Sequence, residues 1–172
     1  MTETPQQYTA RIMSNLTGDD PVKIQAATPT KIARLMKNAS AARLRKRPAP
    51  EKWSVAEIVA HLADAEIVIG YRVRLILGAP GVTIQAFNQD DWAEAGHYAK
   101  RNPHASLDQL NAARQANLSL YKTLTPEQWK VWGMHSERGQ ESVEHIIRMT
   151  AGHDLNHLHQ IENILSQKKK TD

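Results

Sequence analysis

Apolar residues recur along this chain at the spacing that places them on one face of an α-helix. The longest such run lies in residues 54–81, and its apolar stripe consists of Val55, Ile58, Leu62, Ala65, Ile69, Val73 and Ile76. Ser54 and Glu57 stand at its start in the S-x-x-E pattern of a capping box. Gly78 and Pro80 mark its end, because neither residue favours a continued helix. The pattern predicts one long amphipathic helix.

Two shorter stretches before this helix show the same periodicity. Residues 5–16 carry an apolar side chain at every fourth position, which predicts a short amphipathic helix. Residues 28–47 follow with a second apolar stripe. Thr28 and Pro29 predict an N-cap with a proline in the first turn, so we expect the helix to begin there.

Two more helices are predicted in the C-terminal half. Residues 106–129 carry an apolar stripe that Ser106 introduces with a second capping box, and Thr125 caps a short helical turn at its end. Residues 133–141, with the sequence GMHSERGQE, are expected to form a loop. The last helix is predicted over residues 142–167.

A long connection separates the two central helices. Residues 79–105 carry mixed signals, whereas helix–helix connections in bundles usually have about 2–8 residues. This length predicts a crossover between parallel or distant helices, or a loop that covers a site. No segment convincingly predicts a strand. We therefore expect an all-α protein: one domain over residues 1–172, built as a four-helix bundle with a long crossover connection and a short N-terminal helix. Its core spans about residues 8–165, and residues 166–172 form a basic tail.

The composition limits the chemistry that the chain can use. Hydrophobic residues make up 41%, an ordinary share for a globular protein, and cysteine is absent. Without thiolates, any metal must be held by histidine or carboxylate side chains. The longest apolar stretch, around residues 67–77, is interrupted by Arg72 and Arg74. We therefore expect no membrane span, and no secretory signal is visible, so a cytoplasmic location is expected.

The charge balance argues against a nucleic-acid partner. The formal net charge is +4, and the basic residues gather at residues 43–47 and 168–170. A nucleic-acid surface would add a basic stripe with aromatic or polar base readers, which these segments lack. We expect solvated helix ends and a small-molecule partner instead.

Three histidines lie within seven residues of the last predicted helix. His153 and His157 are four residues apart and fall on its apolar face, whereas His159 lies roughly 120° away from His153. His61 lies at the edge of the apolar stripe of the longest helix, and antiparallel packing of the two helices would bring it level with the pair. Three imidazoles and one open position describe a catalytic metal site.

The alternative is that these histidines are hydrogen-bonded core residues. A single inward histidine is more often structural than a ligand, and the H-x-x-x-H pair alone fits both interpretations about equally. Burying three unpaired imidazoles beside aliphatic side chains would cost several kcal/mol unless something organises them. The three together therefore favour a divalent metal ion, while imidazole ligands suit zinc, nickel and copper alike.

Further polar residues are candidates for supporting roles. Gln160 lies on the histidine face and could hydrogen-bond a ligand imidazole or a metal-bound water. Asp154 is a second such candidate, or it is a surface or interhelix residue. His135 could reach the site as a general base, or it could be exposed on its loop. The substrate contacts are expected in the long connection, at Asp90 and Trp92, and around His135.

Four segments of the chain together resemble one family. These are KWSVAEIVAHLADAE (52–66), AFNQDDW (86–92), MHSERG (134–139) and AGHDLNHLHQIENI (151–164). They resemble the DinB-like domain, also called the DinB/YfiT-like metalloenzymes. The resemblance extends from about Tyr8 to Leu165, and the two histidine motifs in this order are more specific than either alone.

The resemblance implies a fold, a metal and two kinds of reaction. It implies a four-helix bundle with an unusual crossover topology, a nickel or zinc ion held by His61, His153 and His157, and a homodimer. Some members transfer low-molecular-weight thiols such as bacillithiol, or use mycothiol in an isomerisation. Members often have glycine at the position of His159. We expect the His159 side chain to point away from the site and assign it no ligand role.

The leading hypothesis is a metal-dependent enzyme that acts on a small molecule, either a hydrolase or a thiol S-transferase. A bound metal would act as a Lewis acid that activates water or a thiol cosubstrate. The alternative is a helical module that binds a metal or a ligand without turnover.

Overall fold

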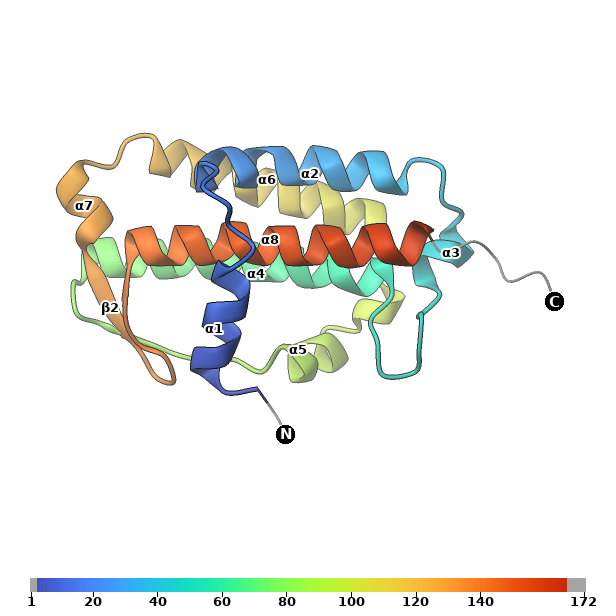
Figure 1. Cartoon of the computed structure of the whole chain (residues 1–172), viewed down its shortest axis with the longest axis horizontal. Coiled ribbons are helices and arrows are strands. Elements are labelled where there is room, and N and C mark those ends of the chain that lie inside the picture. Colours follow the sequence, from blue (N-terminus) through green and yellow to red (C-terminus); the bar gives the residue numbers. More distant parts are fainter. Residues whose placement is uncertain (1–2, 167–172) are drawn as a thin grey trace.

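Four long helices form a bundle in the computed structural model, which describes residues 3–166 (Figure 1). They are α2 (Pro21–Met36), α4 (Val55–Gly78), α6 (Pro103–Tyr121) and α8 (Val143–Ser166). Shorter elements surround them: α1 (Pro5–Met13), α3 (Ala41–Arg45), α5 (Gln89–Ala95), the 3-10 helix η1 (Tyr98–Lys100) and α7 (Pro126–Lys130). The predicted bundle with a short N-terminal helix is confirmed. The predicted basic tail, residues 166–172, lies outside the described residues apart from Ser166.

The crossover gives the bundle its topology. In Figure 1, α4 and α6 run in the same direction. This is possible because the segment that connects them, residues 79–102, returns along the length of the molecule. The other bundle helices, α2 and α8, run the opposite way. The long connection therefore joins two parallel helices, which is one of the two arrangements that its length predicted.

The start of α4 follows its sequence signal. Ser54 accepts a hydrogen bond from the backbone N–H of Glu57, and the Glu57 side chain accepts one from the backbone N–H of Ser54. The same reciprocal box forms at α7 between Thr125 and Gln128. Both caps satisfy N–H groups that a helix start leaves unpaired.

The predicted start of the second helix is wrong. α2 begins eight residues earlier, at Pro21, where the Asp20 side chain accepts from the backbone N–H of Val22. Pro29 therefore lies inside the helix, where it has no N–H to give to the carbonyl of Gln25. That carbonyl instead accepts a hydrogen bond of 2.7 Å from Arg114 Nη1. A side chain from another helix thus compensates for the interior proline.

Two other sequence expectations are also corrected. The capping box at Ser106 does not form: α6 begins at Pro103, because Asn102 accepts from the backbone N–H groups of residues 104 and 105. The expected loop at 133–141 is largely a hairpin, and the expectation of no strand is wrong. Strands β2 (Trp132–His135) and β3 (Gly139–Ser142) pair antiparallel, and β1 (Thr83–Ile84) pairs parallel to β2.

This small sheet fixes the crossover segment to the hairpin. Ile84 pairs with His135, and the backbone N–H of Ser136 donates to the carbonyl of Ile84 at 3.0 Å. The segment that leaves α4 is therefore held beside the turn of the hairpin. Both segments then lie against one side of the bundle, where they wall the cavity described below.

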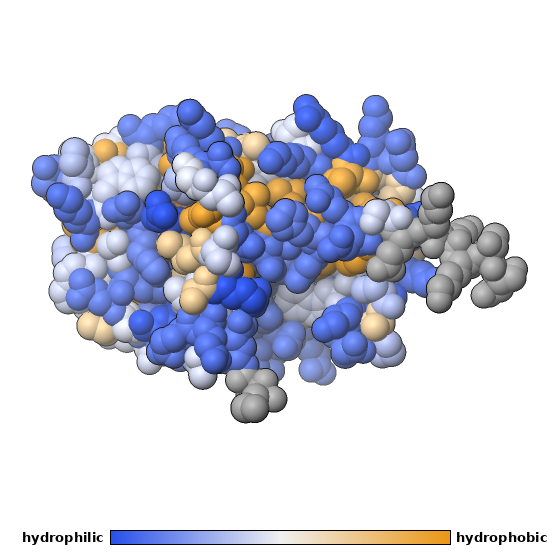
Figure 2. Space-filling view, viewed as in Figure 1, coloured by the Kyte–Doolittle hydropathy of each residue, from blue (hydrophilic) through white to orange (hydrophobic). Residues whose placement is uncertain are grey.

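The apolar stripes of the helices meet in the bundle interior. Two clusters of buried aliphatic residues fill it, one around Ile58, Leu62 and Leu110 and one around Val73, Ile76 and Ile147. The face in Figure 2 is mostly hydrophilic, with hydrophobic side chains gathered in a band between α2 and α8. Within residues 3–166, none of the helices has the length and apolar character that a membrane span requires.

A buried arginine connects all four bundle helices. Arg114, on α6, is 1% exposed and pairs with Asp154 of α8 at 2.6 Å and with Glu66 of α4 at 2.8 Å. Its third partner is the carbonyl of Gln25 on α2. Asn117 also donates to the Glu66 carboxylate at 2.7 Å. We call Arg114, Glu66 and Asp154 the buried triad.

Candidate metal centre

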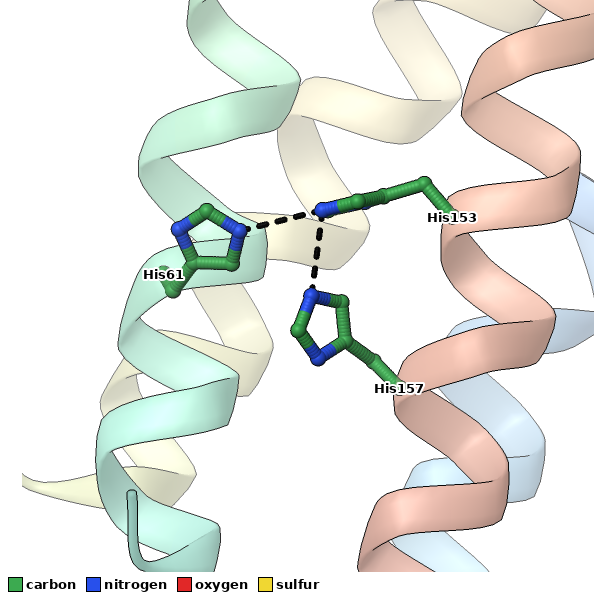
Figure 3. A group of neighbouring side chains, drawn as sticks. All are labelled: His61, His153 and His157. Carbon is green, nitrogen blue, oxygen red and sulfur yellow. Dashed lines mark hydrogen bonds between the residues drawn. The ribbon is translucent and has the colours of Figure 1, made fainter. Parts of the chain in front are cut away.

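Three imidazoles converge between α4 and α8 (Figure 3). His61 extends from α4, and His153 and His157 extend from consecutive turns of α8, as the spacing of four residues requires. The Nε2 atom of His153 lies 3.1 Å from Nε2 of His61 and 3.0 Å from Nε2 of His157. The antiparallel packing of α4 and α8 thus brings His61 level with the pair.

The spacing of these nitrogens suits a single ion. Imidazole nitrogens bind zinc at about 2.0–2.1 Å, so two such ligands lie about 2.9–3.4 Å apart at angles from about 90° to 109°. Two of the three separations, 3.0 and 3.1 Å, fall in that range, and all three nitrogens lie within 4.8 Å of one another. Among residues 3–166, the group of metal-ligating side chains at this point consists of the three histidines. The donor set therefore leaves coordination positions for a water or a substrate.

Burial keeps the three rings in the neutral form that binds metals. Burial, reinforced by the nearby imidazole of His157, lowers the pKa of His61 to about 3. Burial lowers the pKa of His157 to about 4, against the opposing effect of the hydrogen bond that its ring donates to Gln160, and burial holds the pKa of His153 well below its ordinary value. Near neutral pH no proton has to be displaced from these rings before a metal binds.

Gln160 selects the tautomer of His157. Its Oε1 atom lies 2.8 Å from Nδ1 of His157, and since a carbonyl oxygen only accepts, the ring must donate from Nδ1. The lone pair of His157 then sits on Nε2 and points toward the other two rings. Gln160 thus makes one of the two contacts that the sequence analysis considered for it, and His159 is exposed.

A cavity of about 580 Å³ opens beside the histidines. His61 and His153 line it, together with apolar side chains of α4 and α8 such as Ile69 and Ile146. The N-terminal helix α1 and the crossover segment close other sides. The space is large enough for a small organic molecule with one end at the imidazoles.

Comparison with known proteins identifies the family. Residues 26–161 match the DinB superfamily, which is most of the chain. The chain belongs to the DinB superfamily. The resemblance in the two histidine motifs is therefore confirmed, and the three clustered residues are the ones on which it rested.

Several curated relatives share one kind of name. A protein of Oceanobacillus iheyensis is 29% identical over 114 residues, which are 66% of this chain and 65% of that protein. YfiT of Bacillus subtilis is 25% identical over 113 residues, or 65% of this chain and 64% of YfiT. Both carry the name "Putative metal-dependent hydrolase". The matched region thus spans just under two thirds of each of these relatives.

A solved structure shows that the fold is that of YfiT. It is described as "YfiT from Bacillus subtilis is a probable metal-dependent hydrolase with an unusual four-helix bundle topology". The TM-score is 0.77 at 18% identity, and the match covers 97% of this chain and 92% of the solved one. The parallel pair α4 and α6 of this DinB protein therefore belongs to a bundle topology already seen in YfiT.

The remaining candidate residues differ in whether they line the cavity and in how far they are buried. Asp90 lines the cavity of this DinB chain, whereas Trp92 is 40% exposed and packs against Phe87, which does line it. Asp154 is fully buried in the triad, so of its two predicted locations the interhelix one is observed. His135 lines the cavity and is 2% exposed, in contrast to an exposed loop histidine.

The contacts of His135 favour a hydrogen-bond donor over a general base. Its Nδ1 atom accepts from the backbone N–H groups of Glu137 at 3.2 Å and Arg138 at 3.4 Å. The ring proton is therefore on Nε2. Burial, together with the positive charge of Arg138, lowers the pKa of His135 to about 4. The ring is neutral near pH 7 and presents an N–H group.

Two arginines in and beside the cavity were missed as functional candidates. Arg114 has a sequence signal, because it lies on the apolar stripe of α6 where a charged side chain must find buried partners. Arg72 has a similar signal, because it interrupts the apolar run of α4. The sequence does not indicate which carboxylates or carbonyls they meet.

Proposed function

We propose that this chain is a metal-dependent hydrolase that acts on a small organic molecule. The observation that carries the proposal is the convergence of three neutral imidazoles beside a cavity of about 580 Å³, which two of them, His61 and His153, line. A purely structural histidine cluster would not need to adjoin such a space. The names of the relatives support hydrolysis as the reaction.

The residues of the chain have distinct parts in this proposal. His61, His153 and His157 hold a divalent ion, with zinc or nickel as the candidates that imidazole ligands suit. Such an ion, when bound, supplies Lewis acidity toward a water and a substrate carbonyl. Gln160 fixes the ring of His157 in the ligating tautomer. The buried triad holds the turn of α8 that begins at His153, because Asp154 is the next residue.

Metal analysis with a matched pair of variants tests the first half of the proposal. His153→Ala removes a converging imidazole, whereas His159→Ala removes an exposed imidazole from the same helix. We expect the protein and His159→Ala to retain one zinc or nickel ion per chain after dialysis, and His153→Ala to retain none. Equal metal content in the two variants would refute the site.

Turnover tests the second half. We expect ester or amide substrates from a small-molecule panel to be hydrolysed, the activity to be lost with a chelator, and zinc or nickel to restore it. Turnover only when a low-molecular-weight thiol is added would instead identify the thiol S-transferase. A metal-loaded protein that is inert to both panels but holds a ligand would identify a binding module.

A further inference from the structure

Arg72 is a buried cation without a carboxylate partner. Its side chain lines the cavity, and the residue is 6% exposed. One nitrogen, Nη2, donates to the carbonyl of Gln85 at 2.6 Å, and the guanidinium lies over the ring of Phe87 at 5.5 Å from its centroid. None of the ion pairs among residues 3–166 involves Arg72. A buried guanidinium in this state retains donors for an anion.

His135 offers a second donor in the same cavity. Because its Nδ1 atom accepts from two backbone N–H groups, its proton is on Nε2. That Nε2 atom is buried and has no hydrogen-bond partner. Leaving such a group unpaired costs about 1–3 kcal/mol, so a ligand that accepts from it gains affinity.

The sheet places these two donors close together. Arg72 binds the carbonyl of Gln85, which directly follows Ile84, and Ile84 is the strand partner of His135. Burial, together with the charge of Arg138, lowers the pKa of Arg72 to about 10, and Arg72 is among the cations that lower the pKa of His135. Each donor therefore lies within the electrostatic reach of the other.

The buried carboxylates around the cavity are already paired with other arginines. Glu141 accepts from Arg138 at 2.6 and 3.1 Å. Glu66 and Asp154 are held by Arg114. Of the other acids that line the cavity, Glu3 pairs with Arg11 at 2.8 Å, and Glu137 and Asp90 are exposed to solvent. Glu141 acts on Arg72 and His135 through its charge and has no hydrogen bond to either, so their free N–H groups are left for an acceptor from outside the chain.

We propose that Arg72 and His135 together bind a carboxylate group of the substrate, in the cavity that His61 and His153 also line. This inference rests on the proposed function for the identity of the ligand as a substrate. The substrate class is then a carboxylate-bearing ester or amide whose scissile group reaches the imidazoles.

A singly charged carboxylate fits this pair better than a phosphate. One guanidinium edge and one imidazole N–H match the two oxygens of a planar carboxylate. A phosphate dianion brings a third oxygen and a second charge, and Glu137 and Glu141 nearby disfavour that extra charge. The apolar side chains of Ile69 and Ile146 in the same cavity suit the rest of a small organic acid.

Titration calorimetry with simple carboxylates tests the proposal without turnover. Acetate and phenylacetate are titrated into zinc-loaded and metal-stripped full-length protein, in a buffer without carboxylate or phosphate. Phenylacetamide is the neutral counterpart, and inorganic phosphate is the competing anion. The variants are Arg72→Gln and His135→Asn, since asparagine retains an acceptor for the two backbone N–H groups. Arg74→Gln is the control, because Arg74 donates to Gly70 and Asn117 outside the cavity.

We expect phenylacetate to bind both forms of the protein and phenylacetamide to bind far more weakly. Arg72→Gln and His135→Asn should each weaken phenylacetate binding by about 10-fold to 100-fold, because each loses a charge-assisted or buried hydrogen bond. Arg74→Gln should bind as the parent does.

Any one of the following results would overturn the proposal. They are equal binding to Arg72→Gln and the parent, binding that disappears when the metal is stripped but persists in Arg72→Gln, and tighter binding of phosphate than of either carboxylate. Absence of any carboxylate binding would also refute it. Loss of metal binding or of hydrolysis would contradict the proposed function and leave these measurements unaffected.

Discussion

Replacement of Arg114 by methionine removes the charge that holds the bundle interior together. Methionine has a similar length and no charge, so the carboxylates of Glu66 and Asp154 remain buried with no cation beside them. Their side chains are 1% and 0% exposed, so little of their surface is available for solvation by water. The carbonyl of Gln25 loses its donor as well, because Pro29 cannot supply one.

The expected loss of stability is large for a single substitution. Removing one partner of a buried ion pair costs about 3–5 kcal/mol, since it leaves an uncompensated charge. A domain of ordinary stability has only about 5–15 kcal/mol in total. Arg101→Met is the control: Arg101 also lies 2.8 Å from a carboxylate, that of Asp64, but their side chains are 32% and 18% exposed. A surface pair of this kind contributes about 1 kcal/mol or less.

Urea unfolding followed by circular dichroism measures both effects. A third variant, Arg114→Met with Glu66→Gln and Asp154→Asn, removes all three charges and keeps an acceptor for Asn117. It should be more stable than Arg114→Met alone, although it contains two further changes. The Gln25 carbonyl lacks its donor in both Arg114→Met and the triple variant. The difference between their free energies of unfolding therefore reports the effect of the buried charges. If Arg114→Met costs no more than Arg101→Met, or if the triple variant is the less stable one, the reasoning is refuted.

Three further predictions concern single residues. For His135, whose pKa is about 4 when folded and near 6.5 when unfolded, only the unfolded state gains a proton as pH falls between these values. The free energy of unfolding measured with urea should therefore fall less between about pH 6.5 and pH 4 in His135→Asn than in the parent protein. An equal fall in both proteins would contradict this. Gly152→Ala places a Cβ 2.3 Å from a backbone oxygen of α1, so hydrogen exchange in α1 should accelerate, whereas Gly78→Ala meets no atom within 4 Å and should not change it. Gln160→Ala frees the ring of His157 and should weaken zinc affinity about 10-fold to 100-fold in a chelator competition, and an unaltered affinity would exclude an orienting role.

Helical periodicity predicted the parts of the fold that carry most of the site. The stripe of α4 and the capping box at Ser54 are local signals, and they placed His61 on the correct helix. The spacing of His153 and His157 separated this pair from His159 because a helix has a fixed angle per residue. These predictions held since they depend on geometry within one helix.

Other features depend on contacts that local patterns do not contain. Pro29 has the local signal of a helix start, but its lost hydrogen bond is compensated by Arg114 from a distant helix. In β2 the exposed and buried positions alternate, yet the buried ones are Gly133 and His135 in place of aliphatic residues. Burial therefore alternates with the period of two that is typical of a strand, but glycine and histidine at the buried positions do not indicate a strand in the sequence.

The bundle helices carry the imidazoles, whereas the connecting segments form part of the cavity wall. This separation has a consequence for how such a protein can diversify. All three histidines and the buried triad come from α4, α6 and α8, whereas the crossover 79–102 and the hairpin 132–142 supply a separate wall of the cavity. Substitutions, insertions or deletions in these two segments alter what the cavity accepts without moving the imidazoles. A lineage that keeps the bundle can therefore acquire new substrates by exchanging the wall alone.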